Sequence, residues 1–261
     1  MSSLMDIKQI KRVGTAAACR GGKVLQEHFG KLRSVRKKGV IDLVTEADIQ
    51  SEAAIIDTIA QTFPEHAILA EESGSQAGSG GRWIIDPLDG TTNFAHNLPL
   101  FCVSIAFAHD DTLVAGFVLA PLLGELFIGI KGQGAQLNGT PISVSATDSL
   151  SESLLVTGFP YNQQDIFNRL MARFARCMMA TQGIRRLGSA ALDLCYVANG
   201  RFDGFWEEHL QPWDTAAGFL VASEAGARTT LFSGASYTIE AKEIVSTNGA
   251  IHNDLLNLLE K

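Results

Sequence analysis

Residues 83–94 read WIIDPLDGTTNF, a stretch in which two acids, Asp86 and Asp89, follow an apolar run. Two such carboxylates that lie close together without a cation repel each other, which costs free energy or raises the pKa of one acid until it is protonated. A divalent cation between them removes that cost, and several hard oxygen ligands favour Mg²⁺, Mn²⁺ or Ca²⁺ over zinc. Pro87 fixes its own φ and has no N–H, so it can turn the Leu88 carbonyl toward the same point. The stretch therefore predicts a cation site at the end of a strand.

The neighbouring residues supply further groups for such a site. Gly90 permits a tight turn after Asp89, and Thr91 and Thr92 place hydroxyl groups beside it. Glu71 lies at the end of an earlier apolar run, AILAEE at 67–72. Carboxylates at the ends of neighbouring strands can converge on one point, so we expect Glu71 to join the cluster.

Simpler interpretations of the same sequence stretches remain open. The DGTT segment could be only a strand-end turn, because Asp and Gly favour turns. Residues 71–73 could be a solvated loop, and Asp48 could be only the acid of a capping box with Thr45. The haloacid dehalogenase motif, D-x-D-G-T, has a different spacing from the D-x-x-D-G-T found here. An EF-hand loop needs oxygens at alternate positions and a Glu at its twelfth, which this stretch lacks.

Composition bounds the class of protein. A chain of 261 residues, 46% apolar and 19% charged, is typical of a globular protein with one or two domains. Its apolar runs are shorter than the ~18 residues of a membrane span, and its first residues contain no apolar stretch that predicts a secretory signal. The four scattered cysteines favour reduced thiols and a cytoplasmic location. The net charge of −7 argues against direct nucleic-acid binding.

Periodicity predicts an α/β (α+β) protein with two lobes. Residues 31–39 are expected to form a basic loop and residues 73–81 a flexible turn, and Gly21 and Gly22 weaken the first helix. A composition shift at 140–152 divides the chain into an N-terminal lobe (1–145) with most metal ligands and a C-terminal lobe (146–261). Strands are expected at 67–72, 82–87, 102–110, 112–121, 124–132, 154–158, 202–207 and 243–247, and helices at 4–29, 45–63, 162–180, 188–199, 213–225 and 249–260.

Five stretches closely resemble the inositol monophosphatase family of Mg²⁺-dependent, lithium-sensitive phosphatases, in the family's order and along essentially the whole chain. The resemblance implies a layered α/β/α/β/α sugar-phosphatase fold, commonly a homodimer. The matching stretches are DLVTEAD (42–48), EES (71–73), WIIDPLDGTTNF (83–94), GSAALDLCYVANG (188–200) and WDTAAG (213–218).

The resemblance also implies two to three Mg²⁺ ions, for which Mn²⁺ could substitute. One ion would be held by Glu71, Asp86 and the Leu88 carbonyl. A second would be held by Asp86, Asp89 and Asp214, and a weaker third would sit near Glu71 through water. A simpler interpretation of Asp214 is an acid favoured at a helix N-terminus by the helix dipole.

Further roles follow from the same resemblance. Asp48 and Thr91, with Glu71, would form the catalytic set that orients and deprotonates the attacking water. Lys37 would lie in the family's mobile loop. Small residues at 188–190 could instead mean close helix packing, and Glu207 could be a surface strand end. The implied substrate contacts are Gly90, Thr91, Gly188, Ser189, Ala190, Glu207 and Asp214.

The expected activity is Mg²⁺-dependent hydrolysis of a small polyol or sugar phosphate, with myo-inositol 1-phosphate first. The alternatives are fructose-1,6-bisphosphatase (with dual activity in some relatives), histidinol-phosphate phosphatase and 3′,5′-bisphosphonucleotide phosphatase. Some bacterial relatives associate with the transcription machinery, so a partner-binding role is a minor alternative.

Overall fold

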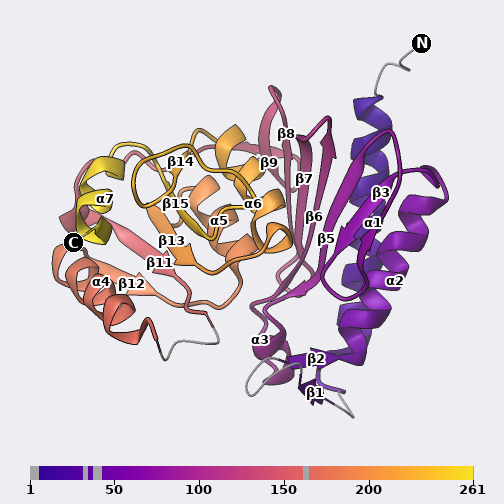
Figure 1. Ribbon diagram of the computed structural model, residues 1–261, viewed down its shortest axis with the longest axis horizontal. Helices are drawn as coiled ribbons and strands as arrows, with labels where there is room; N and C mark the ends of the chain where they lie inside the picture. The colour runs from indigo at the N-terminus through magenta and orange to yellow at the C-terminus, as the bar shows by residue number, and fades with distance from the viewer. Residues whose placement is uncertain (1–5, 32–34, 38–42, 161–164, 261) are drawn as a thin grey trace.

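Seven helices cover two sheets in the computed structural model, which describes residues 6–31, 35–37, 43–160 and 165–260. Figure 1 shows five layers from right to left: α1 with α2, a large sheet, α5 with α6, a small sheet, and α4 with α7. The layered α/β/α/β/α expectation is thus confirmed. The helices are α1 (Ile7–His28), α2 (Glu46–Ala60), α3 (Thr91–Ala95), α4 (Phe167–Ala180), α5 (Ala190–Ala198), α6 (Pro212–Glu224) and α7 (His252–Glu260), with a 3₁₀ turn at Leu150–Glu152.

The large sheet has eight strands in the order β10-β9-β8-β7-β6-β5-β3-β4. Neighbouring strands in this sheet are antiparallel, except for β3 and β5, which are parallel. These two strands therefore end at the same edge of the sheet. Helices cover both of its faces, which explains why its central strands read as nearly continuous apolar runs. The strands are β3 (Ala67–Ala70), β4 (Gly74–Gln76), β5 (Arg82–Asp89), β6 (Cys102–His109), β7 (Thr112–Ala120), β8 (Glu125–Ile130), β9 (Gly134–Leu137) and β10 (Thr140–Ile142).

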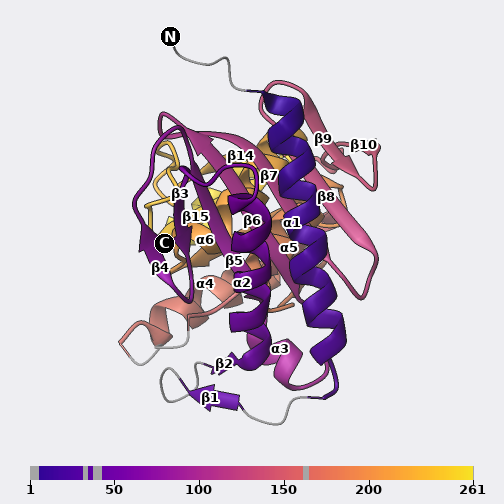
Figure 2. The same cartoon turned by 90° about the vertical axis from the view of Figure 1, so that its right-hand side faces the viewer.

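The outer face of the large sheet is covered by α1 and α2, which lie side by side (Figure 2). The weakening expected at Gly21 and Gly22 does not interrupt α1. A Cβ at Gly21 would lie 2.7 Å from Ile55 Cδ1, and one at Gly22 would lie 2.7 Å from Leu119 Cδ2. These glycines therefore let α1 approach α2 and the sheet closely, and this packing offsets their low helix propensity.

The small sheet has five strands in the order β12-β11-β13-β15-β14. Parallel pairs join β11 to β12 and β13, and antiparallel pairs join β15 to β13 and β14. Its face toward the large sheet carries α5 and α6, so the apolar core between the sheets contains residues of both (Figure 1). The strands are β11 (Leu154–Thr157), β12 (Gly183–Arg185), β13 (Gly204–Glu208), β14 (Arg228–Thr230) and β15 (Glu243–Thr247).

The expected elements differ from the observed ones mainly where segments are short. The predicted basic loop contains β1 (Val35–Lys37), which pairs with β2 (Leu43–Thr45). The predicted flexible turn contains β4, and α3, β9, β10, β12 and β14 were not expected. Elements of three to five residues offer few positions for a periodic pattern, although the five-residue strand at 243–247 was predicted. The helix predicted at 162–180 begins at Phe167, and part of its expected start, residues 162–164, lies outside the described residues.

The division into lobes at residue 145 stays a prediction. Residues from both ranges, such as Phe127 and Phe205, belong to the core between the two sheets. Within the described ranges, none of the helices is long and apolar enough to cross a membrane.

Candidate active site

The end of β5 carries the two acids of the DPLD motif. The register between β5 and β6 shifts between Asp86 and Asp89, which marks a bulge at Pro87–Leu88. The Leu88 N–H donates to Asp86 Oδ1 at 2.9 Å, and the Asp86 side chain is only 2% exposed. A bulge re-aims side chains at the end of a strand, and here it lets both acids line one pocket.

Glu71 reaches the same pocket from the strand beside β5. Its N–H donates to the Ile85 carbonyl at 3.1 Å, which continues the parallel pairing of β3 and β5 by one residue. Glu71 therefore lies next to Asp86 across the sheet edge, and both line the pocket. Glu72 does not line it within the described residues.

The turn after β5 brings Thr91 toward Asp48. Gly90 has a φ of +96°, and a Cβ there would lie 2.9 Å from the Leu100 carbonyl oxygen. The Thr91 hydroxyl can donate to either of two acceptors, Asp48 Oδ1 at 3.3 Å or the Leu88 carbonyl at 3.1 Å. Asp48 is buried behind Thr91 on α2, whereas Thr91 lines the pocket.

The N-terminus of α5 faces Asp89. The Ser189 hydroxyl donates to Asp89 Oδ2 at 2.7 Å, and the Ala191 N–H donates to the same oxygen at 2.8 Å. Gly188, with a φ of +91°, and Ala190 also line the pocket. Asp89 of the large sheet thus accepts hydrogen bonds at the start of this helix, whose N-cap is Ser189.

Asp214 lies in the first turn of α6 and also lines the pocket. Its Oδ2 accepts the Gln211 N–H at 2.7 Å, and Gln211 and Asp214 form a reciprocal capping box. The helix-terminus interpretation of Asp214 thus applies together with its place in the pocket.

Glu207 lines the pocket from the end of β13, so it is not an ordinary surface strand end. A Cβ at Gly158 would lie 2.2 Å from both Glu207 carboxylate oxygens, so only a glycine leaves room for this side chain. The next residue, Glu208, is 6% exposed and pairs with Arg169 at 2.7 Å and Arg173 at 3.0 Å.

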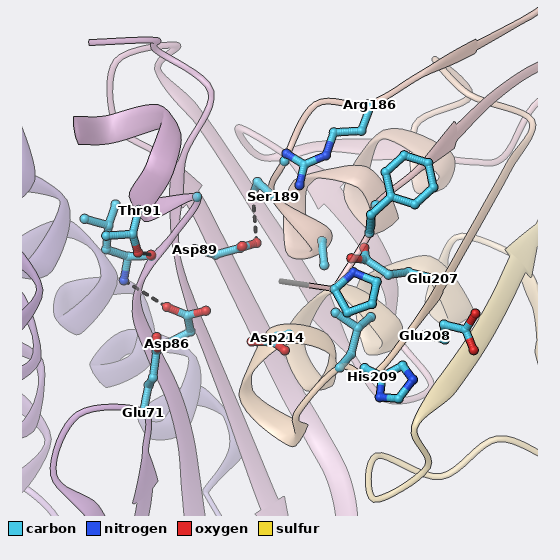
Figure 3. A pocket seen from close by; sticks show the side chains of 18 residues that line it. Glu71, Asp86, Asp89, Thr91, Arg186, Ser189, Glu207, Glu208, His209 and Asp214 are labelled. Carbon is cyan, nitrogen blue, oxygen red and sulfur yellow. Dashed lines mark hydrogen bonds between the residues drawn. The ribbon is translucent and has the colours of Figure 1, made fainter. Parts of the chain in front are cut away.

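Figure 3 shows these side chains around one space between the two sheets, with a cavity volume of about 180 Å³. Glu71, Asp86 and Asp89 point into it from the large sheet, and Glu207 faces them from the small sheet. The sequence analysis did not single out three further residues that line the pocket, Arg186, Phe159 and Pro160.

Acid clustering changes the protonation of the pocket. Burial, reinforced by the charges of Glu71 and two further acids, raises the pKa of Asp86 well above its ordinary value. Burial raises the pKa of Asp89 to about 6, although hydrogen bonds from Ser189 and Ala191 favour its charged form. Burial also raises the pKa of Asp214 to about 8, and burial with the charge of Asp214 raises that of Glu207 to about 8.

The donor set fits a hard divalent cation. It consists of carboxylates and a backbone carbonyl, with neither imidazole nor thiolate among the implied ligands. A cation would offset the burial and the like-charge repulsion that raise the pKa of these acids. In the described part of the chain, no three acidic, histidine or cysteine side chains converge closely enough to hold an ion as they stand. One oxygen each of Asp86, Asp89 and Asp214 is engaged by a backbone N–H.

The site residues expected from the sequence thus fall into three groups. Those that line the pocket are Glu71, Asp86, Leu88, Asp89, Gly90, Thr91, Gly188, Ser189, Ala190, Glu207 and Asp214. Asp48 contacts the pocket through Thr91. Lys37 ends β1, and its side chain lies outside the described structure, as does that of Thr45, the expected capping partner of Asp48.

Comparison with known proteins agrees with this fold. A sequence model of the inositol monophosphatase family matches residues 6–261. The chain therefore belongs to the inositol monophosphatase family, a family of generally Mg²⁺-dependent phosphomonoesterases.

Three relatives illustrate the range of names within the family. An inositol-1-monophosphatase of Synechocystis sp. is 44% identical over 97% of this chain and 90% of its own length. Nus factor SuhB of Pseudomonas aeruginosa is 43% identical over 87% of this chain and 86% of its own. The crystal structure of extragenic suppressor protein suhB from Bartonella henselae superposes with a TM-score of 0.94 at 38% identity, covering 97% of this chain and 99% of that one.

Proposed function

We propose that the protein is a Mg²⁺-dependent phosphomonoesterase that hydrolyses myo-inositol 1-phosphate or a related small polyol phosphate. The observation that carries the proposal is the meeting, in one pocket, of carboxylates from the large sheet and from helix α6. Glu71, Asp86 and Asp89 come from the large sheet, and Asp214 comes from the first turn of α6. Such a cluster of carboxylates can bind divalent cations, and these would supply the positive charge that stabilises a phosphate ester.

Two to three Mg²⁺ ions would be held by Glu71, Asp86, the Leu88 carbonyl, Asp89 and Asp214, as the family resemblance implies. When bound, Mg²⁺ would offset the negative charge of the phosphate and raise the acidity of the attacking water. Mn²⁺ has the same preference for oxygen ligands and is expected to substitute.

The proton of the attacking water has a path within the chain. The Thr91 hydroxyl, 3.3 Å from Asp48 Oδ1, can accept that proton and pass its own to the carboxylate. Asp48 thereby acts as the general base. Water attacks phosphorus in line, no covalent phosphoenzyme forms, and the products are the alcohol and inorganic phosphate.

Substrate recognition is proposed for Glu207 and for the backbone amides on two sides of the pocket. Glu207 can accept hydrogen bonds from polyol hydroxyl groups, and the amides near Gly188–Ala190 and Gly90–Thr91 can approach the phosphate. The name of the Synechocystis relative supports inositol 1-phosphate as the first choice.

Phosphate release from a substrate panel, with and without Mg²⁺, tests the proposal. The panel contains inositol 1-phosphate, fructose 1,6-bisphosphate, histidinol phosphate and 3′-phosphoadenosine 5′-phosphate. We expect Mg²⁺-dependent release led by inositol 1-phosphate and lost in Asp89→Asn. Release led by another compound would keep the mechanism and change the substrate, whereas no release by folded, Mg²⁺-loaded protein would overturn the enzyme proposal.

Lithium is expected to inhibit by replacing the second Mg²⁺. The assay compares LiCl with KCl at equal ionic strength. Equal activity in the two salts would contradict lithium sensitivity without affecting the metal site.

A second candidate is a role in the transcription machinery, supported by the Nus factor name of the Pseudomonas aeruginosa relative. A pull-down of purified bacterial RNA polymerase with the parent protein and Asp89→Asn tests it. Capture by both proteins would support binding independent of catalysis, and capture by neither would remove this candidate.

A further inference from the structure

One face of α2 carries three buried polar residues where an apolar stripe is expected for a core-facing helix. Asp48, Ser51 and Glu52 are 1%, 0% and 4% exposed. Residues three and four apart lie on the same side of a helix. This polar face of α2, Asp48–Ser51–Glu52, therefore points toward the large sheet, and only Asp48 has a part in the proposed reaction.

The Glu52 carboxylate holds the backbone directly after Glu71. Its Oε2 accepts the Glu72 N–H at 2.9 Å, and its Oε1 accepts the Ser73 N–H at 2.9 Å. Hydrogen bonds to an ionised acceptor are stronger than those between neutral groups. Both oxygens of one side chain thus hold two successive N–H groups of the turn between β3 and β4.

Ser51 makes the corresponding contact with the DPLD bulge. Its hydroxyl donates to the Pro87 carbonyl at 3.0 Å, between Asp86 and Leu88. Helix α1 packs against α2 at this level, because a Cβ at Gly21 would lie 2.9 Å from the Ser51 hydroxyl oxygen. The helix cannot shift here without disturbing its packing on α1.

We propose that Glu52 is a positioning residue for the cation site, with Ser51 in a supporting role. Glu52 sets the turn that aims Glu71, and Ser51 sets the bulge that aims Asp86. A rigid helix thereby fixes the distance between two ligands that come from different strands. The inference rests on the proposed function insofar as these acids bind Mg²⁺.

The test is Glu52→Gln. An amide offers one acceptor oxygen, and its NH₂ group meets the second backbone N–H, so one of the two hydrogen bonds is lost. Losing a residue that orients a metal ligand typically costs 10–100-fold in metal affinity or activity. We expect Mg²⁺ binding, measured by isothermal titration calorimetry, to weaken about 10-fold or more, and kcat at saturating Mg²⁺ to stay within about threefold of the parent.

The matched control is Glu46→Gln, the same substitution on an exposed residue of α2. It should leave Mg²⁺ affinity unchanged. Ser51→Ala keeps the site carboxylates and removes the Pro87 contact, so it carries the test if Glu52→Gln does not fold. We expect a smaller loss of Mg²⁺ affinity there, on the order of threefold, because one neutral hydrogen bond is removed.

A merely structural role would lower the metal-free melting temperature without changing Mg²⁺ affinity. Affinity within twofold of the parent in Glu52→Gln, or in Ser51→Ala where the former is unfolded, would overturn the inference. A parent that binds Mg²⁺ but releases no phosphate, with affinity still weakened in Glu52→Gln, would sink the proposed function and leave the positioning role standing. A parent that binds no Mg²⁺ would sink both.

Discussion

At the scale of single residues, the pocket acids differ in what else they hold. Asp89 accepts two hydrogen bonds from the start of α5, Asp214 caps α6, and Asp86 accepts the N–H of its own bulge. Each carboxylate therefore has one oxygen engaged by the fold. The remaining oxygen of each is the one a cation would use, so substitutions of these acids act on folding and on chemistry to different degrees.

Asp86→Asn is expected to lower kcat/KM by on the order of 10²–10³-fold, the loss seen when one preorganised electrostatic contact is removed. The reason is that Asp86 lies between Glu71 and Asp89 and would bridge two ions. Steady-state phosphate release measures it, with the exposed Asp110→Asn as the matched control. A loss of less than about threefold would contradict the bridging role.

Asp48→Asn is expected to separate catalysis from metal binding. Asn cannot accept the proton that the Thr91 hydroxyl passes on, so kcat should fall by about 10²–10⁴-fold. Mg²⁺ affinity, measured by calorimetry, should stay near the parent value because Asp48 lies behind Thr91. Loss of Mg²⁺ binding in this variant would show that Asp48 is a ligand and not the base.

At the scale of elements, close contacts at glycine decide how α1 lies on the large sheet. A Cβ at Gly14 would lie 2.2 Å from the buried ring of Phe117 on β7. Gly14 and Gly22 thus let α1 approach the sheet, and Gly21 lets it approach α2; this packing offsets their low helix propensity.

Gly14→Ala sets two effects against each other. Alanine gains up to about 1 kcal/mol in helix propensity, whereas overpacking a well-packed core costs typically 1–3 kcal/mol. We expect a net decrease in the free energy of unfolding of about 1 kcal/mol, measured by urea titration. Cys19→Ala, an exposed position in the same helix, is the control and should change little. A stabilised Gly14→Ala protein would show that the Phe117 ring moves aside freely.

How far the sequence predicted these elements depends on their length. The strand at 243–247 was predicted with its observed bounds, and the DPLD strand was placed within two residues of its end. The three-residue strands β12 and β14 are too short to show the alternation of apolar and polar residues that predicts a strand. Glu52 and Arg186 were missed for another reason: neither belongs to a recognisable motif, and the only signal for Glu52 was a charge on a core-facing side of α2. The acids that line the pocket were predicted because the stretches around them resemble the motifs of the inositol monophosphatase family, in the same order along the chain.

At the scale of the whole molecule, the pocket lies between the two sheets. The proposed Mg²⁺ ligands that line it come from distant parts of the chain, from Glu71 to Asp214. Metal binding should therefore stabilise the fold as a unit, since a ligand that binds only the native state adds to its stability. Assembly into a homodimer stays a prediction, which light scattering can check against the 28.0 kDa mass of one chain.

The metal-free protein is expected to lose stability as pH rises from about 4 to about 8. Asp214 and Glu207 have a pKa of about 8 in the fold, against roughly 4 when unfolded. Because the folded state holds these protons more tightly, its advantage is greatest at low pH and is lost as pH rises through the folded pKa. Mg²⁺ needs deprotonated ligands, so its stabilising effect should grow over the same range.

Melting temperatures in EDTA and in Mg²⁺ at pH 5.5, 7 and 8.5 check this expectation. Asp214→Asn provides the comparison, and its metal-free melting temperature should vary less with pH. A stabilisation by Mg²⁺ that is equal at pH 5.5 and 8.5 would contradict the link between these protons and the cation.

The cap that Asp89 places on α5 bears on how this family can diverge. A descendant that abandoned phosphate chemistry for a partner would still need an acceptor at this position. The helix α5 packs between the two sheets, and without that acceptor the Ser189 hydroxyl and the Ala191 N–H would lose their partner. Selection for folding alone would then preserve a hydrogen-bond acceptor at position 89, which either an aspartate or an asparagine supplies. The architecture therefore requires an acceptor at this position, and only the proposed cation requires its negative charge.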